Sequence, residues 1–161
     1  MTMEKPKHIL LVEDDAKDIE LTLGAISKHN LAAEVVVTRD GQEALDYLYR
    51  RGQFAKIRPG YPAVILLDLK MPRVDGIQVL KQLKTDPQLC NIPVVILTAS
   101  GEYRDLKKCY SLGVNAYVVK PVRFKEFIDI VKTIGIFWTL INEPLPILQT
   151  VSTLINGKLD R

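Results

Sequence analysis

Short apolar runs alternate with segments of helical periodicity along the chain. Five runs rich in aliphatic or β-branched residues predict β-strands, at 8–12, 34–38, 63–68, 93–98 and 115–119. Between them, apolar residues recur at the spacing of one helix face, as Ile19, Leu23 and Ile26 do. Helices are expected at about 16–29, 41–51, 77–85 and 103–112, and from 123 onwards. This alternation predicts an α/β fold, a parallel sheet with right-handed crossovers and helices on both faces.

Polar side chains that can do chemistry stand where the predicted strands end: Glu13, Asp14, Asp15, Asp68, Thr98 and Lys120. The carboxyl ends of parallel strands meet at one edge of a sheet, where α/β folds bind their ligands. Three carboxylates gathered there repel one another unless they share a proton or a cation, and Mg²⁺ suits such oxygen ligands. Asp15 is expected instead to cap the helix that follows it.

Asp68 is the expected centre of this chemistry. A carboxylate can act as a nucleophile toward a phosphoryl group and form an aspartyl-phosphate. The hydroxyl of Thr98 and the ammonium of Lys120 can then hold phosphoryl oxygens, because phosphoryl transfer asks mainly for positioning and charge neutralisation.

Each of these residues also has a plainer interpretation when it is taken alone. Asp68 can be an ordinary acid at a strand end. Glu13 and Asp14 can be a solvated helix start, because acids favour the first helical turn. Lys120 can be a surface lysine that lays its stem along apolar surface. Asp75, just before Gly76, is better explained as a turn residue than as a ligand.

Composition and charge limit the possible functions. The chain has 161 residues, 47% of them apolar, and a net charge of +3 spread along the sequence, which gives no reason to expect a nucleic-acid partner. Cys90 and Cys109 lack metal-ligand spacing and are expected to be reduced thiols in the cytoplasm. We expect neither a signal peptide nor a membrane span. No glycine-rich phosphate loop occurs, which disfavours a nucleotide-dependent enzyme.

Four segments together resemble the receiver domains of two-component response regulators. They are LLVEDD, LLDLKMPRVDG, VVILTAS and NAYVVKP, in the order and spacing of that family. The resemblance covers about residues 6–135. It implies a doubly wound, flavodoxin-like sheet of five parallel strands in the order 2-1-3-4-5, and a signalling role in place of metabolic catalysis.

The resemblance also assigns roles to individual residues. It implies that Asp68 is the phosphoacceptor, that Thr98 is the switch hydroxyl, and that Lys120 binds the phosphate. It implies a Mg²⁺ or Mn²⁺ ion held by Glu13, Asp14, Asp68 and the backbone carbonyl of Lys70. Tyr117 matches the aromatic residue that responds to the threonine, although it can also simply pack against the fourth helix. Pro121 matches a proline that typically follows a cis peptide bond.

A histidine kinase is the partner that this family implies. The long loop before the third strand and the ending GIFWTLINEPLP are similar to small stand-alone regulators that partner bacterial phytochromes, especially in cyanobacteria. No output domain is expected, so the signal would pass through protein–protein contacts, either by handing the phosphoryl group on in a phosphorelay or by binding a target protein. The alternative is a pseudo-receiver, a protein-binding module that works without phosphorylation.

The C-terminal part, 136–161, is expected to be an extension of a receiver at 6–135. Phe137, Trp138 and Ile141 are large apolar residues on a helix that outruns the sheet. A proline break follows, and a second apolar stripe comes after it, made of Leu145, Leu148, Val151 and Ile155. Apolar surface of this kind predicts a homodimer. The competing expectation is a monomer whose tail folds back on its own receiver.

Overall fold

The computed structural model describes residues 7–28, 33–57 and 60–145. Its strands are β1 (His8–Val12), β2 (Glu34–Thr38), β3 (Val64–Leu67), β4 (Val94–Thr98) and β5 (Ala116–Val119). They form one parallel sheet in the order β2-β1-β3-β4-β5. The predicted fold and strand order are confirmed.

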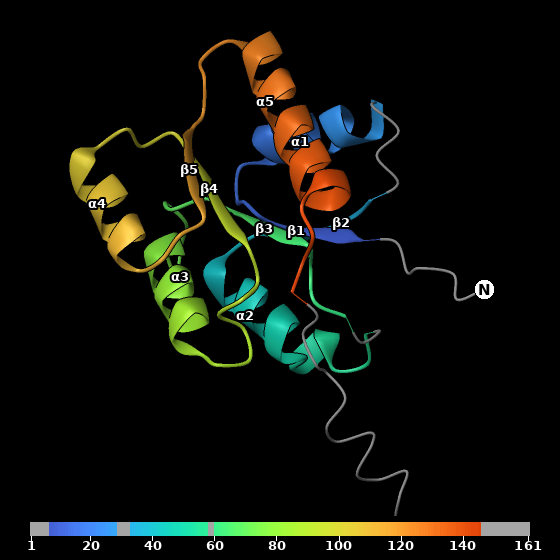
Figure 1. Ribbon diagram of the computed structural model, residues 1–161, viewed down its shortest axis with the longest axis vertical. Coiled ribbons are helices and arrows are strands. Elements are labelled where there is room, and N and C mark those ends of the chain that lie inside the picture. The colour runs from blue at the N-terminus through green and yellow to red at the C-terminus, as the bar shows by residue number, and fades with distance from the viewer. Residues whose placement is uncertain (1–6, 29–32, 58–59, 146–161) are drawn as a thin grey trace, which may run out of the picture.

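Five α-helices connect and follow the strands: α1 (Ala16–Lys28), α2 (Gly41–Tyr49), α3 (Gly76–Thr85), α4 (Tyr103–Ser111) and α5 (Phe124–Ile136). Two short helical segments accompany them: a 3₁₀ turn, η1 (Gly52–Phe54), and a π-helical segment, η2 (Phe137–Ile141). Helices α1 and α5 cover one face of the sheet, and α2, α3 and α4 cover the other (Figure 1).

Successive strand residues point to opposite faces and build two separate cores. In β1, Ile9 and Leu11 pack toward α1 and α5, whereas Leu10 and Val12 pack toward α2, α3 and α4. Strands β1, β3 and β4 are buried almost throughout, as expected of parallel strands covered on both faces. Strand β5 is only partly buried, because it lies at the edge of the sheet.

Local side-chain chemistry fixes where the helices begin and end. Asp40 caps α2 by accepting a hydrogen bond from the Glu43 N–H at 2.8 Å. Asp75 and Gln78 form a reciprocal capping box at the start of α3, each side chain accepting from the other's backbone N–H at 2.9 Å. Asp75, which the sequence favoured as a turn residue over a ligand, is a helix-capping residue. Gly113, with φ of +93°, follows the end of α4.

The segment after α5 continues as η2, and the Asn142 N–H closes it by donating to the Phe137 carbonyl at 2.7 Å. Thr139 is buried there, and its hydroxyl donates to the Gly135 carbonyl at 2.6 Å. Trp138 packs against the core beneath α1 and α5. Of the large apolar residues expected here, Trp138 is thus partly covered, whereas Phe137 and Ile141 are exposed. Leu148, Val151 and Ile155 lie outside the described residues.

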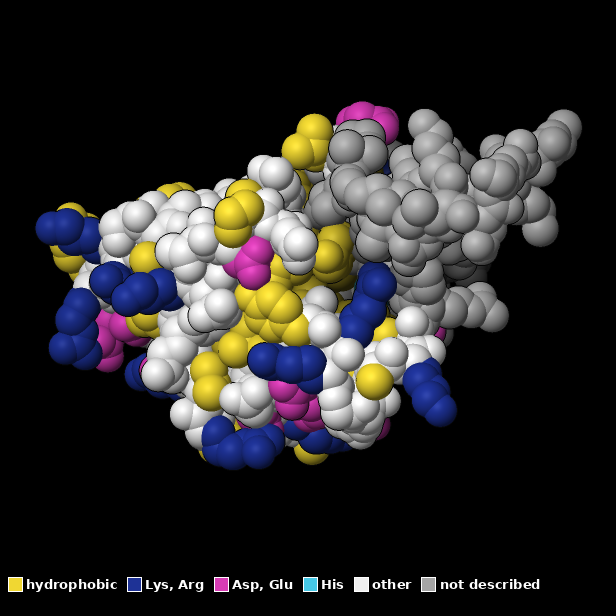
Figure 2. Space-filling view, turned by 90° about the horizontal axis from the view of Figure 1, so that it is seen from below, with side chains coloured by type: hydrophobic (Ala, Val, Ile, Leu, Met, Phe, Trp, Pro, Cys, Tyr) yellow, Lys and Arg dark blue, Asp and Glu magenta, His cyan; other side chains and the backbone are white. Residues whose placement is uncertain are grey.

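One end of the molecule illustrates how charges are distributed. Figure 2 shows hydrophobic side chains at the centre of this face, with Lys and Arg side chains scattered among acidic and uncharged ones. The scatter matches the spread of basic residues along the sequence. In the part of the chain that the structure describes, no helix has the length and apolar character needed to cross a membrane.

Candidate functional site

Backbone hydrogen bonds extend the sheet by one residue beyond its strands. The Asp68 N–H donates to the Val12 carbonyl at 3.0 Å, which sets Asp68 beside the end of β1. The Lys120 N–H donates to the Thr98 carbonyl at 2.7 Å, so β5 delivers its lysine to the same edge. The residues predicted from the strand ends therefore share one edge of the sheet.

Three carboxylates meet at this edge. Glu13, Asp14 and Asp68 each offer one oxygen, and these oxygens all lie within 4.8 Å of one another. Glu13 and Asp68 are buried, whereas Asp14 is exposed. Hard divalent cations prefer such oxygen ligands, and Mg²⁺ keeps several waters when few carboxylates hold it. The donor set therefore fits Mg²⁺ or Mn²⁺, with Asp14 on the side open to solvent.

One carboxylate oxygen of Asp68 accepts a backbone hydrogen bond, and the other lies near Lys120. Oδ1 accepts a hydrogen bond from the Leu69 N–H at 2.8 Å. Oδ2 lies 3.5 Å from the Nζ atom of Lys120. Lys70, the expected source of a backbone carbonyl ligand, follows in the loop after β3 and has an exposed side chain.

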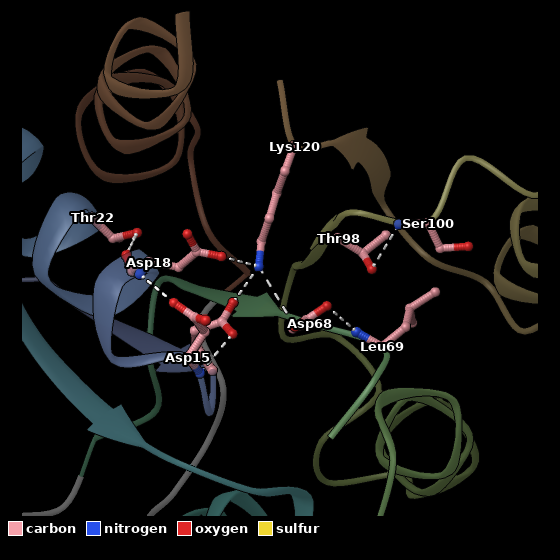
Figure 3. A network of polar contacts seen from close by, with 9 residues as sticks. Asp15, Asp18, Thr22, Asp68, Leu69, Thr98, Ser100 and Lys120 are labelled. Atoms are coloured by element: carbon pink, nitrogen blue, oxygen red, sulfur yellow. Dashed lines mark hydrogen bonds and ion pairs between the residues drawn. The ribbon is translucent and has the colours of Figure 1, made fainter. Parts of the chain in front are cut away.

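Lys120 reaches across the site to residues of the first strand and helix (Figure 3). Its Nζ atom lies 2.6 Å from Glu13 Oε2 and 2.8 Å from Asp18 Oδ2, both closer than the oxygen of Asp68. The lysine was expected beside Asp68, on the far side from the acidic pair. It is instead shared among three carboxylates, because its long side chain can reach the densest negative charge of the site.

Burial and charge act against each other in the Glu13–Lys120 pair. Burial raises the pKa of Glu13 to about 7, with a further rise from Asp68, although the ammonium of Lys120 opposes the shift. Burial alone would lower the pKa of Lys120, but its hydrogen bonds to Asp18 and Glu13 outweigh that effect and raise it. Lys120 is therefore charged at neutral pH and neutralises part of the acidic cluster.

A second set of contacts links Thr98 to Tyr117 of β5 and to α4. Thr98 is buried, and its Oγ1 accepts a hydrogen bond from the Ser100 N–H at 3.3 Å. The Tyr117 hydroxyl donates to the Ser100 carbonyl at 2.8 Å. The Ser100 hydroxyl donates to Asp105 of α4 at 2.5 Å. The predicted pair of Thr98 and Tyr117 is thus connected through Ser100.

The expectation of a cis peptide bond before Pro121 is wrong. The described residues contain no cis peptide bond, so the bond between Lys120 and Pro121 is trans. The trans form is the usual one for an X–Pro bond unless its surroundings select the other.

Two acids that contact the site residues, Asp18 and Asp105, were not singled out from the sequence. Each lies in the first turn of its helix, α1 or α4. Acids are common there because they complement the helix dipole, so position alone gave no sign of a further contact. Only the packing of α1 beside Lys120, and of α4 beside Ser100, brings these contacts about.

The match to a known family spans most of the chain. The model of the response regulator receiver domain matches residues 9–132. Response regulator Rcp1 of Synechocystis sp. is 38% identical over 133 residues, which are 83% of this chain and 89% of Rcp1. A solved Mn²⁺-bound structure of a response regulator Rcp1 covers 87% of this chain and 99% of its own, with a TM-score of 0.81 and 36% identity.

Two further solved structures are phytochrome response regulators. Phosphorylated RcpA, a cyanobacterial phytochrome response regulator, has a TM-score of 0.82 and 40% identity, and the match covers 87% of this chain and 99% of RcpA. The bacteriophytochrome response regulator RtBRR has a TM-score of 0.71 and 53% identity, with 96% of this chain and 93% of RtBRR covered. Sheet order, site and family match agree: this chain belongs to the response regulator receiver domain family of signalling proteins, and it is similar to the phytochrome response regulators.

Proposed function

We propose that this protein accepts a phosphoryl group on Asp68 from a histidine kinase and signals through the resulting change of its surface. The observation that carries the proposal is the position of Asp68, which belongs to the acidic cluster and has an oxygen 3.5 Å from the Lys120 ammonium. A nucleophilic carboxylate there has both a site for a cation and a fixed positive charge next to it.

The proposed reaction balances with the groups present and a phosphohistidine donor. An oxygen of Asp68 forms a bond to phosphorus while the bond from phosphorus to the donor imidazole nitrogen breaks. The electron pair of that bond stays on the imidazole. A Mg²⁺ ion held by Glu13, Asp14, Asp68 and the Lys70 carbonyl would neutralise charge on the phosphoryl oxygens. Lys120 would contribute a second positive charge beside the phosphoryl oxygens.

The proposed output uses the contacts around Thr98. A phosphoryl group on Asp68 offers new acceptor oxygens to the Thr98 hydroxyl, whose movement disturbs the Ser100 N–H that now contacts it. Because Ser100 also holds Tyr117 and Asp105, the change reaches β5 and α4. A local change of charge would thereby alter the surface that partner proteins contact.

The proposed kinase partner is a phytochrome, and the proposed location is the cytoplasm. RcpA and RtBRR are described as phytochrome and bacteriophytochrome response regulators, and both match at 40% identity or more. Phosphotransfer from a panel of histidine kinases tests this part of the proposal. A phytochrome kinase is expected to phosphorylate the protein faster than kinases of other signals.

Phosphorylation itself can be tested without any kinase. The protein is mixed with Mg²⁺ and acetyl phosphate, and intact-mass spectrometry is used to look for the gain of one phosphoryl group. The gain is expected in the parent and in Asp75→Asn, which alters an acid at the start of α3 outside the acidic cluster. It is expected to vanish in Asp68→Asn. A folded parent that gains no mass would support the alternative, a protein-binding module that works without phosphorylation.

A further inference from the structure

Glu13 is held by a lysine and also belongs to the acidic cluster. Its Oε2 atom lies 2.6 Å from the Nζ atom of Lys120, the shorter of that lysine's two hydrogen bonds. The same carboxylate offers an oxygen to the cluster that fits a divalent cation. A cation entering the cluster therefore competes with Lys120 for Glu13 and also repels the ammonium.

Lys120 can give up Glu13 only if another counter-ion remains. Its side chain is 10% exposed, and a buried charge without a partner is strongly unfavourable. An ammonium has three N–H donors, and Asp18 takes one of them at 2.8 Å. Asp68, at 3.5 Å, is too distant for a good hydrogen bond and is itself part of the cluster.

Asp18 is well placed for that task. It is not among the three clustered carboxylates, so a cation there leaves it free to stay with the lysine. Its backbone N–H donates to the Asp15 side chain at 2.8 Å, and the Thr22 hydroxyl donates to its carbonyl at 2.7 Å. These contacts fix the first turn of α1 and point the Asp18 carboxylate at Lys120 (Figure 3).

We propose that Asp18 is a positioning residue that keeps Lys120 in the site when Glu13 binds a divalent cation. This inference rests on the metal site of the proposed function and adds a residue to it. Without the Asp18 carboxylate, Glu13 is the one carboxylate among the described residues that still hydrogen-bonds Lys120. A cation that binds Glu13 must then leave a buried ammonium without a partner. Asp18 thus favours cation binding without contacting the cation.

The test measures Mn²⁺ affinity directly, from the electron paramagnetic resonance signal of the free ion. Asp18→Asn keeps the shape of the side chain and removes its charge, and it is expected to weaken binding by about three- to tenfold, the range of one partly exposed ion pair. Glu20→Gln removes the same charge from an exposed position of α1 and is the matched control. It is expected to bind Mn²⁺ nearly as the parent does.

A second background separates action through the lysine from a general effect of charge. In Lys120→Met there is no ammonium to hold, so adding Asp18→Asn is expected to change Mn²⁺ affinity little. Equal weakening in both backgrounds would overturn the proposal, because Asp18 would then act by its charge alone. Asp18→Glu restores a carboxylate and is expected to recover part of the lost affinity.

The outcomes also separate this proposal from the one it rests on. If the parent binds Mn²⁺ and Asp18→Asn binds it equally well, the role of Asp18 is refuted and the metal site stands. If the folded parent binds no Mn²⁺, the proposed metal site and the role of Asp18 both fall.

Discussion

Asp14 and Asp15 are neighbours in the sequence with different surroundings in the structure. Asp14 belongs to the acidic cluster with Glu13 and Asp68. The Asp15 side chain accepts the Asp18 N–H at 2.8 Å and so caps α1. One residue of register thus separates a proposed cation ligand from a helix cap.

This difference predicts unequal effects of two similar substitutions. Asp14→Ala is expected to abolish Mg²⁺ binding, because the cluster loses its solvent-facing carboxylate. Asp15→Ala is expected to keep most of the affinity while losing about 1 kcal/mol of stability, the usual cost of a helix cap. Calorimetric Mg²⁺ titration and urea unfolding measure the two effects. Equal loss of Mg²⁺ binding in both variants would show that the acidic pair has been assigned one residue too early.

The roles of single residues divide into those visible in the sequence and those that packing creates. The strand-end acids could be predicted, because a buried parallel strand must deliver its next residue to the ligand-binding edge. The partners of Lys120 could not be predicted, because a long flexible side chain can pair with any carboxylate that the fold places within its reach. The partial burial of Trp138 could not be predicted from the sequence either, because it depends on how the end of the chain packs against the core.

At the scale of the elements, the start of α3 lies against the backbone of Asp68, the proposed phosphoacceptor. The Gly76 N–H at its start donates to the Leu69 carbonyl at 2.8 Å. A Cβ atom at this position would overlap the carbonyl oxygen of Asp68 and would lie 2.7 Å from the Cα of Leu69. Glycine is therefore required here for close approach of the helix to the end of β3.

Gly76→Ala is expected to destabilise the protein by about 1–3 kcal/mol, because the overlap is with backbone that cannot turn aside. It should also displace Asp68 and slow its phosphorylation by acetyl phosphate. The control is Gly24→Ala in α1, where an added Cβ meets nothing within 4 Å, and a stability gain of up to about 1 kcal/mol is expected. Urea unfolding compares them, and a Gly76→Ala midpoint equal to the parent's would refute the close-contact argument.

Element positions were predicted well and element ends less well. Hydrophobic periodicity located all the strands and helices because each must bury one face or both. The end of α2 differs, since the helix was expected to reach Arg51 but stops at Tyr49. Arg50 adopts a left-handed conformation with φ of +55°. Glycine usually marks such a cap, and here the sequence has arginine.

At the scale of the whole molecule, the end of the helical segment presents apolar side chains to solvent. The exposed ones are Phe137, Leu140, Ile141 and Leu145. Leu140 and Ile141 are 66% and 65% exposed, more than a core residue would be. The homodimer and the division into a receiver at 6–135 and an extension remain predictions, now based on this surface.

The dimer can be tested without removing Trp138 from its core. We expect the full chain to sediment as a dimer at micromolar concentration, and Leu140→Glu combined with Ile141→Glu to sediment as a monomer, because buried charges oppose association. Thr85→Glu, at the exposed end of α3, adds charge elsewhere and should stay dimeric. A parent that is monomeric with and without phosphodonor would instead favour a tail folded back on its own receiver.

The reach of Lys120 also has a consequence for how the sheet frays. In the described residues β5 pairs with β4 alone, yet its terminal lysine is tied past β3 to residues that follow β1 and lie on α1. The ion pairs of Lys120 are therefore expected to stabilise β5, an edge strand, by linking its end to the other side of the site. Lys120→Met removes these ion pairs and should speed amide hydrogen exchange in β5 by roughly tenfold. This rate change is equivalent to a fall of about 1.4 kcal/mol in the free energy of local opening. The opposite edge, β2, should exchange as before. The residue proposed to bind phosphate would then also stabilise the edge strand that is proposed to carry the signal outward.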